Sequence, residues 1–219
     1  MPFLMALFYD RAIAKTEEAC LRQWRQELLR QLHGDVLELG AGTGANVGFY
    51  PDEVSRLVLS EPDRHMRRQL SSKLESLGLS RASVAGGSAE RIEAADESFD
   101  WVVSSLVCCS VNNLQASLAE VRRVLKPGGG FVFMEHVAAT AGTSRRKWQN
   151  RLNPLWKTLM GNCHLNRETE QAIVDAGLEI AQIERESMRK APPIVRPTIR
   201  GIAIKPSLQA EPEKVAGSR

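Results

Sequence analysis

The sequence predicts a doubly wound α/β fold, in which a largely parallel sheet is covered by helices on both faces. Two observations support this prediction. Short apolar runs of strand length alternate with longer segments in which apolar residues recur at helical spacing. A glycine-rich turn, "GAGTG" at residues 40–44, directly follows the first of these runs. Strands that alternate with helices are joined by right-handed crossovers, so the strands run parallel.

The expected elements follow in order along the chain. Apolar residues at helical spacing predict an amphipathic helix over residues 9–32, which His33 and Gly34 should end. We expect a short helix after the glycines and longer helices at 64–77 and 113–125. Strands are expected at 35–40, 56–62, 82–87, 99–107 and 131–137. The segment from Lys126 to Gly130 should separate the helix at 113–125 from the fifth strand.

The last third of the chain changes character. Residues 138–166 carry two tryptophans, several basic residues and an interrupting Pro154, and we expect them to form an inserted helical cover. A last helix at 167–176 precedes strands at 178–186 and 199–205, which have no helix between them and should pair antiparallel. The chain then divides into an N-terminal helical region (1–33), a main domain (34–206) and a tail (207–219). The tail lacks a periodic apolar pattern and is expected to be disordered.

Composition and charge narrow the class of function. The chain has 219 residues, of which 43% are hydrophobic and 25% charged, as in ordinary globular proteins. Its net charge of +3 is too small to favour a nucleic-acid partner. The four cysteines show no C-x-x-C spacing, so they indicate neither a zinc site nor a disulfide framework and favour a cytoplasmic location.

The apolar opening "MPFLMALFY" is too short to span a bilayer and lacks the basic region of a signal peptide. Two roles are possible for this segment. It packs into an apolar cleft of the protein itself, or it makes a weak contact with a membrane surface.

The glycine turn predicts a ligand site. Gly40, Gly42 and Gly44 let the backbone approach a ligand closely at the N-terminus of a helix, where free N–H groups point outward. The dinucleotide pattern G-x-G-x-x-G/A is also satisfied, by Gly40, Gly42 and Ala45. The P-loop pattern G-x-x-x-x-G-K-[ST] is absent. The glycines alone therefore leave a dinucleotide and S-adenosylmethionine as candidates.

Two carboxylates help to separate these candidates. Glu38 lies two residues before the first glycine, where it would face a pyrophosphate unfavourably but would suit the ammonium and sulfonium groups of S-adenosylmethionine. Glu61, at the end of the second expected strand, is positioned to accept hydrogen bonds from both hydroxyls of a ribose, which serves NAD and adenosine equally. Glu38, Glu61 and the closing antiparallel pair together favour the methyl donor.

The sequence resembles a known family. The segments "VLELGAGTG", "SEPD", "GGSAE", "FDWVVSSLV" and "LKPGGGFVFMEH" are similar, in this order, to the class I S-adenosylmethionine-dependent methyltransferases over residues 34–137. That family has a Rossmann-like, seven-stranded sheet with an antiparallel last strand and helices on both faces. Further segments, from "GANVGFYP" to "VRPTIRGIAIK", are similar to the alkyl thiol S-methyltransferases of animals and their bacterial relatives, up to about residue 206. The animal proteins have a longer hydrophobic N-terminal anchor.

The resemblance implies a set of contacts with the cofactor. Its members run from the methionine end, through the ribose and the adenine, to the transferred methyl group: Glu38, Gly40, Ala41, Gly42, Gly44, Asn46, Glu61, Pro62, Met66, Ser88, Ala89, Ser105 and Leu106. Ser88 departs from the family, which commonly has a carboxylate at this position. The sequence therefore lacks one expected hydrogen bond to the adenine amine.

The acceptor side of the site is less defined. A thiol with a pKa of about 8.5 is only a few per cent thiolate at neutral pH, so a nearby histidine would raise its reactivity. His136 ends the fifth expected strand, at the sheet edge where open α/β folds bind ligands, and is our catalytic candidate. Its alternative is a histidine that only packs. Residues expected to contact the acceptor are Phe8, Tyr9, Trp148 and His164.

Each of these acceptor residues has an alternative role. Phe8 and Tyr9 would act through an N-terminal lid, as in similar methyltransferases, or would belong to an interfacial anchor. Trp148 would otherwise be a core residue. Cys108 and Cys109 follow an apolar strand and are expected to be structural, because free cysteine there behaves as a small hydrophobe. Cys163 and His164 are too few for a metal site and should help to fix the helical cover, although His164 could extend into the cleft.

The sequence therefore predicts an S-adenosylmethionine-dependent methyltransferase that acts on a small thiol or sulfide by in-line displacement. We expect a monomer or a homodimer with no bound metal. Two enzymatic alternatives change only the acceptor, to a phospholipid amine or a quinone ring carbon. Two alternatives belong to other classes of protein, an oxidoreductase and a non-catalytic protein that binds S-adenosylmethionine or NAD.

Overall fold

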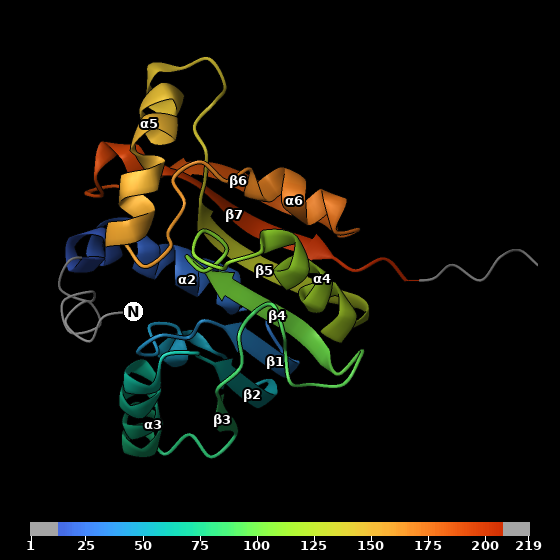
Figure 1. The fold of residues 1–219 in the computed structure, drawn as a ribbon. Coiled ribbons are helices and arrows are strands. Elements are labelled where there is room, and N and C mark those ends of the chain that lie inside the picture. Colours follow the sequence, from blue (N-terminus) through green and yellow to red (C-terminus); the bar gives the residue numbers. More distant parts are fainter. Residues whose placement is uncertain (1–12, 208–219) are drawn as a thin grey trace, which may run out of the picture.

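A seven-stranded sheet forms the centre of the computed structural model, which describes residues 13–207 (Figure 1). Its strand order is β3-β2-β1-β4-β5-β7-β6. The parallel strands are β1 (Gly34–Leu39), β2 (Val54–Ser60), β3 (Ala82–Ala85), β4 (Phe99–Ser105) and β5 (Leu125–His136). β7 (Pro197–Ile204) lies between β5 and β6 (Glu179–Ser187) and is antiparallel to both. This confirms the predicted sheet with its antiparallel last strand.

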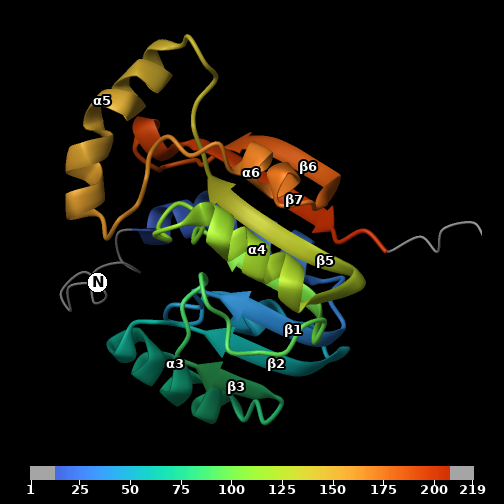
Figure 2. The same cartoon turned by 45° about the vertical axis from the view of Figure 1, so that its right-hand side comes forward.

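Helices cover the two faces of this sheet (Figure 2). Successive residues of a strand point to opposite faces, so Val36 packs with one cluster and Leu37 with the other. The Val36 cluster includes buried residues of α2 (Arg22–Leu29) and α3 (Arg64–Leu77). The Leu37 cluster includes residues of α4 (Leu114–Val124) and α6 (Thr169–Asp175). The central strands β1, β4 and β5 are largely buried on both sides, which explains why they are nearly continuous apolar runs, whereas β3 and β6 at the edges of the sheet are more exposed.

The expected helical cover contains one long helix, α5 (Ser144–Leu159), which stands away from the sheet beyond the end of β5 (Figures 1 and 2). The prediction that Pro154 interrupts this segment is wrong, since the helix continues through it. The fully buried Gln149 ties α5 to the fold by donating to the carbonyls of Val137 and Ile194.

Three other local predictions differ from the structure. The short helix expected after the glycines is reduced to turns and a three-residue 3₁₀ helix, η2 (Val47–Phe49). The stretch from Lys126 to Gly130 was expected to separate a helix from a strand, but it belongs to β5. Its backbone is held there by hydrogen bonds to Lys205, in a part of β5 where the register with β4 is irregular. The link between β6 and β7 contains a 3₁₀ helix, η3 (Pro193–Val195), where no helix was expected.

The N-terminal helix is described from residue 13 onward. From there it includes a π-helical turn, η1 (Glu17–Leu21), and continues as α2. Phe8 and Tyr9, and with them the proposed lid or anchor, lie outside the described residues, as does the tail from residue 208. Within residues 13–207, no helix is both long enough and apolar enough to cross a bilayer.

Candidate functional site

A cavity of about 820 Å³ lies where the carboxyl ends of β1, β2 and β4 meet. Its wall is built from the glycine turn after β1, the loops after β2, β3 and β4, and residues 161–162 that follow α5. In open α/β sheets this edge is where ligands bind. The fold therefore brings loops from five separate parts of the chain to one site.

Most of the residues predicted to contact the cofactor line this cavity. They are Glu38, Gly40, Ala41, Gly42, Glu61, Pro62, Met66, Ser88, Ala89, Ser105 and Leu106. Gly44 and Asn46 are not in the lining. The amide of Gly44 donates to the carbonyl of Ala41 within the turn, and Asn46 is fully buried behind the wall. These two residues therefore shape the site from outside the cavity.

The glycine turn packs closely against the loop after β4. Gly40 has a φ of +56°, and a Cβ atom on it would lie 2.7 Å from the Cγ2 atom of Val107. Both the backbone conformation and the available space thus require glycine at this position. Gly42, with a φ of +57°, has no such neighbour, and its amide donates to the carboxylate of Glu61 at 2.9 Å.

Glu61 joins the first two loops of the site. Its Oε2 atom accepts the Gly42 amide, and its Oε1 atom accepts the amide of Asp63 at 2.8 Å. Burial raises the pKa of this carboxyl group, while both hydrogen bonds oppose the rise. Each oxygen keeps a second lone pair. Glu61 is therefore held in one orientation and can still accept hydroxyl groups from a ligand.

Glu38 sits in a buried polar network. Its Oε1 atom accepts from the side-chain amide of Asn46 at 2.8 Å, and its Oε2 atom accepts from the hydroxyl of Tyr50 at 2.7 Å. Burial raises the pKa of Glu38 to about 7, and the charge of the nearby Arg25 opposes this rise. The guanidinium of Arg25 pairs with Glu17 at 3.0 Å and donates to Asn46 at 2.6 Å.

Sequence reasoning missed Arg25 and Tyr50. Arg25 is one of several arginines on the first helix, and Tyr50 lies at the end of the segment expected as a short helix, so neither stands out by spacing. Packing of α2 against η2 brings Arg25 near Glu38, and the path of the chain after η2 places the Tyr50 hydroxyl on the Glu38 carboxylate. Arg25 itself lines the cavity.

The loop after β4 forms the opposite wall. Leu106 has a φ of +61°, which is strained for a side chain with a Cβ atom, and its amide donates to the carbonyl of Met134 at 2.8 Å. Strain of this kind clusters at functional sites. Asn162, another lining residue absent from the predictions, donates from its side-chain amide to the carbonyl of Ser110 at 2.9 Å. This bond fixes the segment after α5 to the β4 loop.

The residues predicted on the acceptor side lie differently. His136 is buried, is not in the lining of the cavity, and has its Nε2 atom 3.0 Å from the Sγ atom of Cys163. Nδ1 of His164 lies 3.1 Å from the carbonyl of Cys109, also outside the lining.

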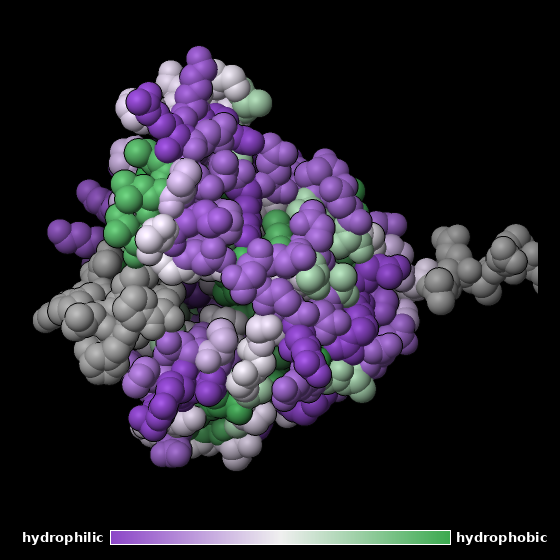
Figure 3. All heavy atoms as spheres, in the orientation of Figure 1, coloured by the Kyte–Doolittle hydropathy of each residue, from purple (hydrophilic) through white to green (hydrophobic). Residues whose placement is uncertain are grey.

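Trp148 is 56% exposed on α5, so the core role considered for it does not hold. It shares the exposed face of the helix with Leu152, Leu155 and Leu159. Figure 3 shows a green, hydrophobic patch over the region of α5. Trp148 is likewise absent from the cavity lining.

Comparisons with known proteins agree with this geometry. Residues 37–133 match a family model described as a methyltransferase domain. The human thiol S-methyltransferase TMT1B is 37% identical over 219 residues, covering 93% of this chain and 85% of that protein. Human TMT1A is 39% identical over 173 residues, covering 78% and 70% of the two chains. Among solved structures, a putative methyltransferase from Bacillus halodurans superposes with a TM-score of 0.70 at 17% identity, covering 86% of this chain and 100% of that one.

Proposed function

Because the chain belongs to the S-adenosylmethionine-dependent methyltransferase family that includes the human thiol S-methyltransferases, we propose that it methylates the sulfur of a small thiol. The observation that carries the proposal is the cavity at the carboxyl ends of β1, β2 and β4, with Glu38 and Glu61 in its wall. The 37% identity to human TMT1B, over 85% of that protein, also supports the proposal.

The residues of the cavity fit S-adenosylmethionine, the cofactor of this family. Its volume of about 820 Å³ is within the range of small-molecule sites. Glu61, held by two backbone amides, would accept the ribose hydroxyls. Glu38 would provide negative charge near the methionine end, and the guanidinium of Arg25 would face its carboxylate. Pro62, Met66 and Ala89 would supply an apolar surface for the adenine.

When bound, S-adenosylmethionine supplies a methyl group on a positively charged sulfur, which is already activated for displacement. The residues of this chain then bind, orient and exclude water. Positioning of this kind contributes about 7 to 11 kcal/mol to lowering a barrier. Ser105 and Leu106, on the β4 loop, would lie near the transferred methyl group. His136 as acceptor of the thiol proton stays a prediction, as do a cytoplasmic location and a monomeric or dimeric state.

A methyl-transfer screen tests the acceptor. The purified chain is incubated with labelled S-adenosylmethionine and, separately, with sulfide, methanethiol, longer alkyl thiols, phosphatidylethanolamine vesicles and a demethylated quinone. We expect turnover with the thiols. Turnover with the lipid or the quinone, and none with any thiol, would overturn the proposal.

Calorimetry tests the cofactor independently of the acceptor. We expect S-adenosylmethionine and S-adenosylhomocysteine to bind and NAD not to bind. Tight binding of NAD, together with no binding of S-adenosylhomocysteine, would instead indicate an oxidoreductase.

A further inference from the structure

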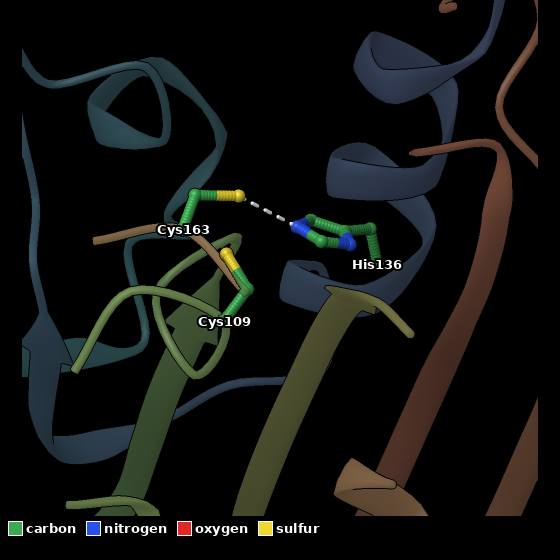
Figure 4. A group of neighbouring side chains, drawn as sticks. All are labelled: Cys109, His136 and Cys163. Atoms are coloured by element: carbon green, nitrogen blue, oxygen red, sulfur yellow. Dashed lines mark hydrogen bonds between the residues drawn. The ribbon is translucent and has the colours of Figure 1, made fainter. Parts of the chain in front are cut away.

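Two cysteines and one histidine meet next to the cavity, outside the cofactor residues (Figure 4). Cys109 lies in the loop after β4, His136 ends β5, and Cys163 lies between α5 and α6. Their sulfur and nitrogen atoms all lie within 4.8 Å of one another, and the Nε2 atom of His136 is 3.0 Å from the Sγ atom of Cys163. All three side chains point toward a common centre.

The surroundings hold these side chains in position. Cys109 and His136 are buried, and Cys163 is partly buried. The indole of Trp156 donates to the Cys163 sulfur at 3.4 Å, and the Cys109 sulfur lies 3.5 Å from the carbonyl of Leu106. His136 is therefore fixed by the end of β5, while these contacts hold Cys109 and Cys163 in the two loops that face it, and the buried position favours a defined site over a chance surface contact.

The donor set suits zinc. Thiolate and imidazole ligands are those that Zn²⁺ prefers, and catalytic zinc sites use three protein ligands and keep a fourth position open. With Zn–S near 2.3 Å and Zn–N near 2.0 Å, tetrahedral ligand atoms lie about 3.5 to 3.8 Å apart. The atoms here all lie within 4.8 Å of one another, so displacements of about 1 Å close the site.

The position of the cluster links it to the reaction. Cys109 and Cys163 are immediate sequence neighbours of Ser110 and Asn162, which line the cavity. Cys109 also contacts Leu106, another residue of the wall. The cluster thus lies directly behind the wall formed by the β4 loop and the segment after α5.

We propose that Cys109, His136 and Cys163 bind Zn²⁺ and that its open fourth position takes the sulfur of the acceptor thiol. The second half of this statement rests on the proposed function. When zinc binds, the S–H bonds of Cys109 and Cys163 break, two Zn–S bonds form, and the two protons leave to solvent. When the acceptor then binds, its S–H bond breaks, a third Zn–S bond forms, and its proton leaves to solvent with no change of oxidation state. A thiol coordinated to a metal is deprotonated, so the acceptor becomes a thiolate. In this proposal His136 is a zinc ligand, and this role replaces that of the base predicted from the sequence.

The charges around the cluster agree with an anionic fourth ligand. Two cysteine thiolates neutralise the charge of Zn²⁺, so a third thiolate gives the site one negative charge. The guanidinium of Arg167, which donates to the carbonyls of Cys108 and Val111, lies beside the cluster and offsets this charge. No sequence motif indicates such a site, because its three ligands come from three separate segments.

Metal binding tests the first half of the proposal without any turnover. The reduced, metal-free full chain is dialysed against ZnCl₂, and bound zinc is measured by elemental analysis. We expect one zinc per chain, and at least tenfold weaker binding in Cys163→Ser. Cys20→Ser, which alters a buried cysteine outside the cluster, is the matched control and should bind like the wild type. Thermal unfolding monitored by circular dichroism checks that both variants fold.

Cobalt substitution tests the second half and does not depend on the variants. Co²⁺ bound to the wild type should give the thiolate charge-transfer and visible bands of a tetrahedral sulfur-rich site. Adding a small alkyl thiol, without S-adenosylmethionine, should shift the visible bands, whereas the corresponding alcohol should not. Unchanged bands would overturn the role of the acceptor as fourth ligand.

Absence of stoichiometric zinc in the wild type, equal binding in Cys163→Ser, or a Cys109–Cys163 disulfide that persists in reductant would overturn the site itself. Full thiol methylation by the metal-free chain would overturn its role and leave the proposed function standing. Zinc binding without thiol methylation would instead count against the proposed function alone.

Discussion

The hydroxyl of Tyr50 donates to the Oε2 atom of Glu38 across 2.7 Å, and both side chains are buried. Burial raises the pKa of Glu38 to about 7, while the hydrogen bonds from Tyr50 and Asn46 and the charge of Arg25 act against the rise. A carboxyl group in the wall of the cavity therefore titrates near neutral pH. This property leads to two tests of how the site recognises a cation.

The first test replaces the carboxyl group by Glu38→Gln. In the wild type we expect the affinity for S-adenosylmethionine to fall by up to about tenfold per unit as the pH drops from about 7 to about 6, because the cation prefers the ionised carboxylate. The variant should bind more weakly at about pH 8 and lose this dependence. Calorimetry across the pH range measures both. A wild-type affinity that does not change with pH would contradict the assignment.

The same variant should change the pH dependence of stability. The pKa of Glu38 is raised above its ordinary value of 4.5, so the folded state binds more protons than the unfolded state between pH 4.5 and about 7. Stability from this group is present below pH 4.5 and declines as the pH rises toward 7, by at most about 3 kcal/mol. Urea unfolding should show this decline in the wild type and a smaller one in Glu38→Gln.

The second test removes the hydrogen bond with Tyr50→Phe. This bond lowers the pKa of Glu38, so its loss should raise that pKa and move the midpoint of the pH-dependent binding upward. The free energy of unfolding should fall by about 1 kcal/mol, the usual value of one hydrogen bond. The midpoint is read from calorimetric titrations at several pH values, and a midpoint that moves downward would refute the role of this bond.

Glu61→Gln tests the predicted ribose contact. The amide cannot accept both the Gly42 and Asp63 backbone N–H groups and the ribose hydroxyls, so we expect affinity for S-adenosylmethionine to fall by about 10- to 100-fold. Glu75→Gln makes the same chemical change on the exposed side of α3 and is the control. Equal affinities of the two variants in calorimetry would exclude this role of Glu61.

Gly40→Ala tests the shape of the turn. The added Cβ atom would lie 2.7 Å from Val107 in a backbone conformation that costs alanine about 1 kcal/mol or more. We expect weaker cofactor binding and a lower melting temperature. Gly48→Ala adds the same atom in open space, and it should leave both properties nearly unchanged. A Gly40→Ala variant that binds and melts like the wild type would show that the turn tolerates a side chain.

The sheet was predictable because each strand carries its own signal. β1, β4 and β5 are apolar runs buried on both faces, and their alternation with helices limits the topology to very few arrangements. The local errors arose where tertiary contacts override local chemistry. The glycines at 128–130 read as a break, yet their backbone is held in β5 by bonds to Lys205 and by pairing with β4.

Most of the residues predicted to contact the cofactor line one cavity, because they lie at strand ends that meet at one edge of the sheet. Glu38 and Glu61 follow from their places on β1 and after β2. The cluster of two cysteines and a histidine could not be predicted in this way, although the sequence singled out His136 by itself. Cys109, His136 and Cys163 belong to segments separated by 26 residues or more, and no motif connects them.

The sequence by itself determined the order of strands and helices, the antiparallel end of the sheet and the glycine turn with its two carboxylates, because these depend on residue patterns within short segments. The tertiary structure decided the rest. Packing of α2 placed Arg25 beside Glu38 and withdrew that carboxylate from water, which set its pKa near neutrality. The meeting of β4, β5 and the segment after α5 brought two sulfurs and an imidazole together, since only long-range packing joins residues so far apart in the chain.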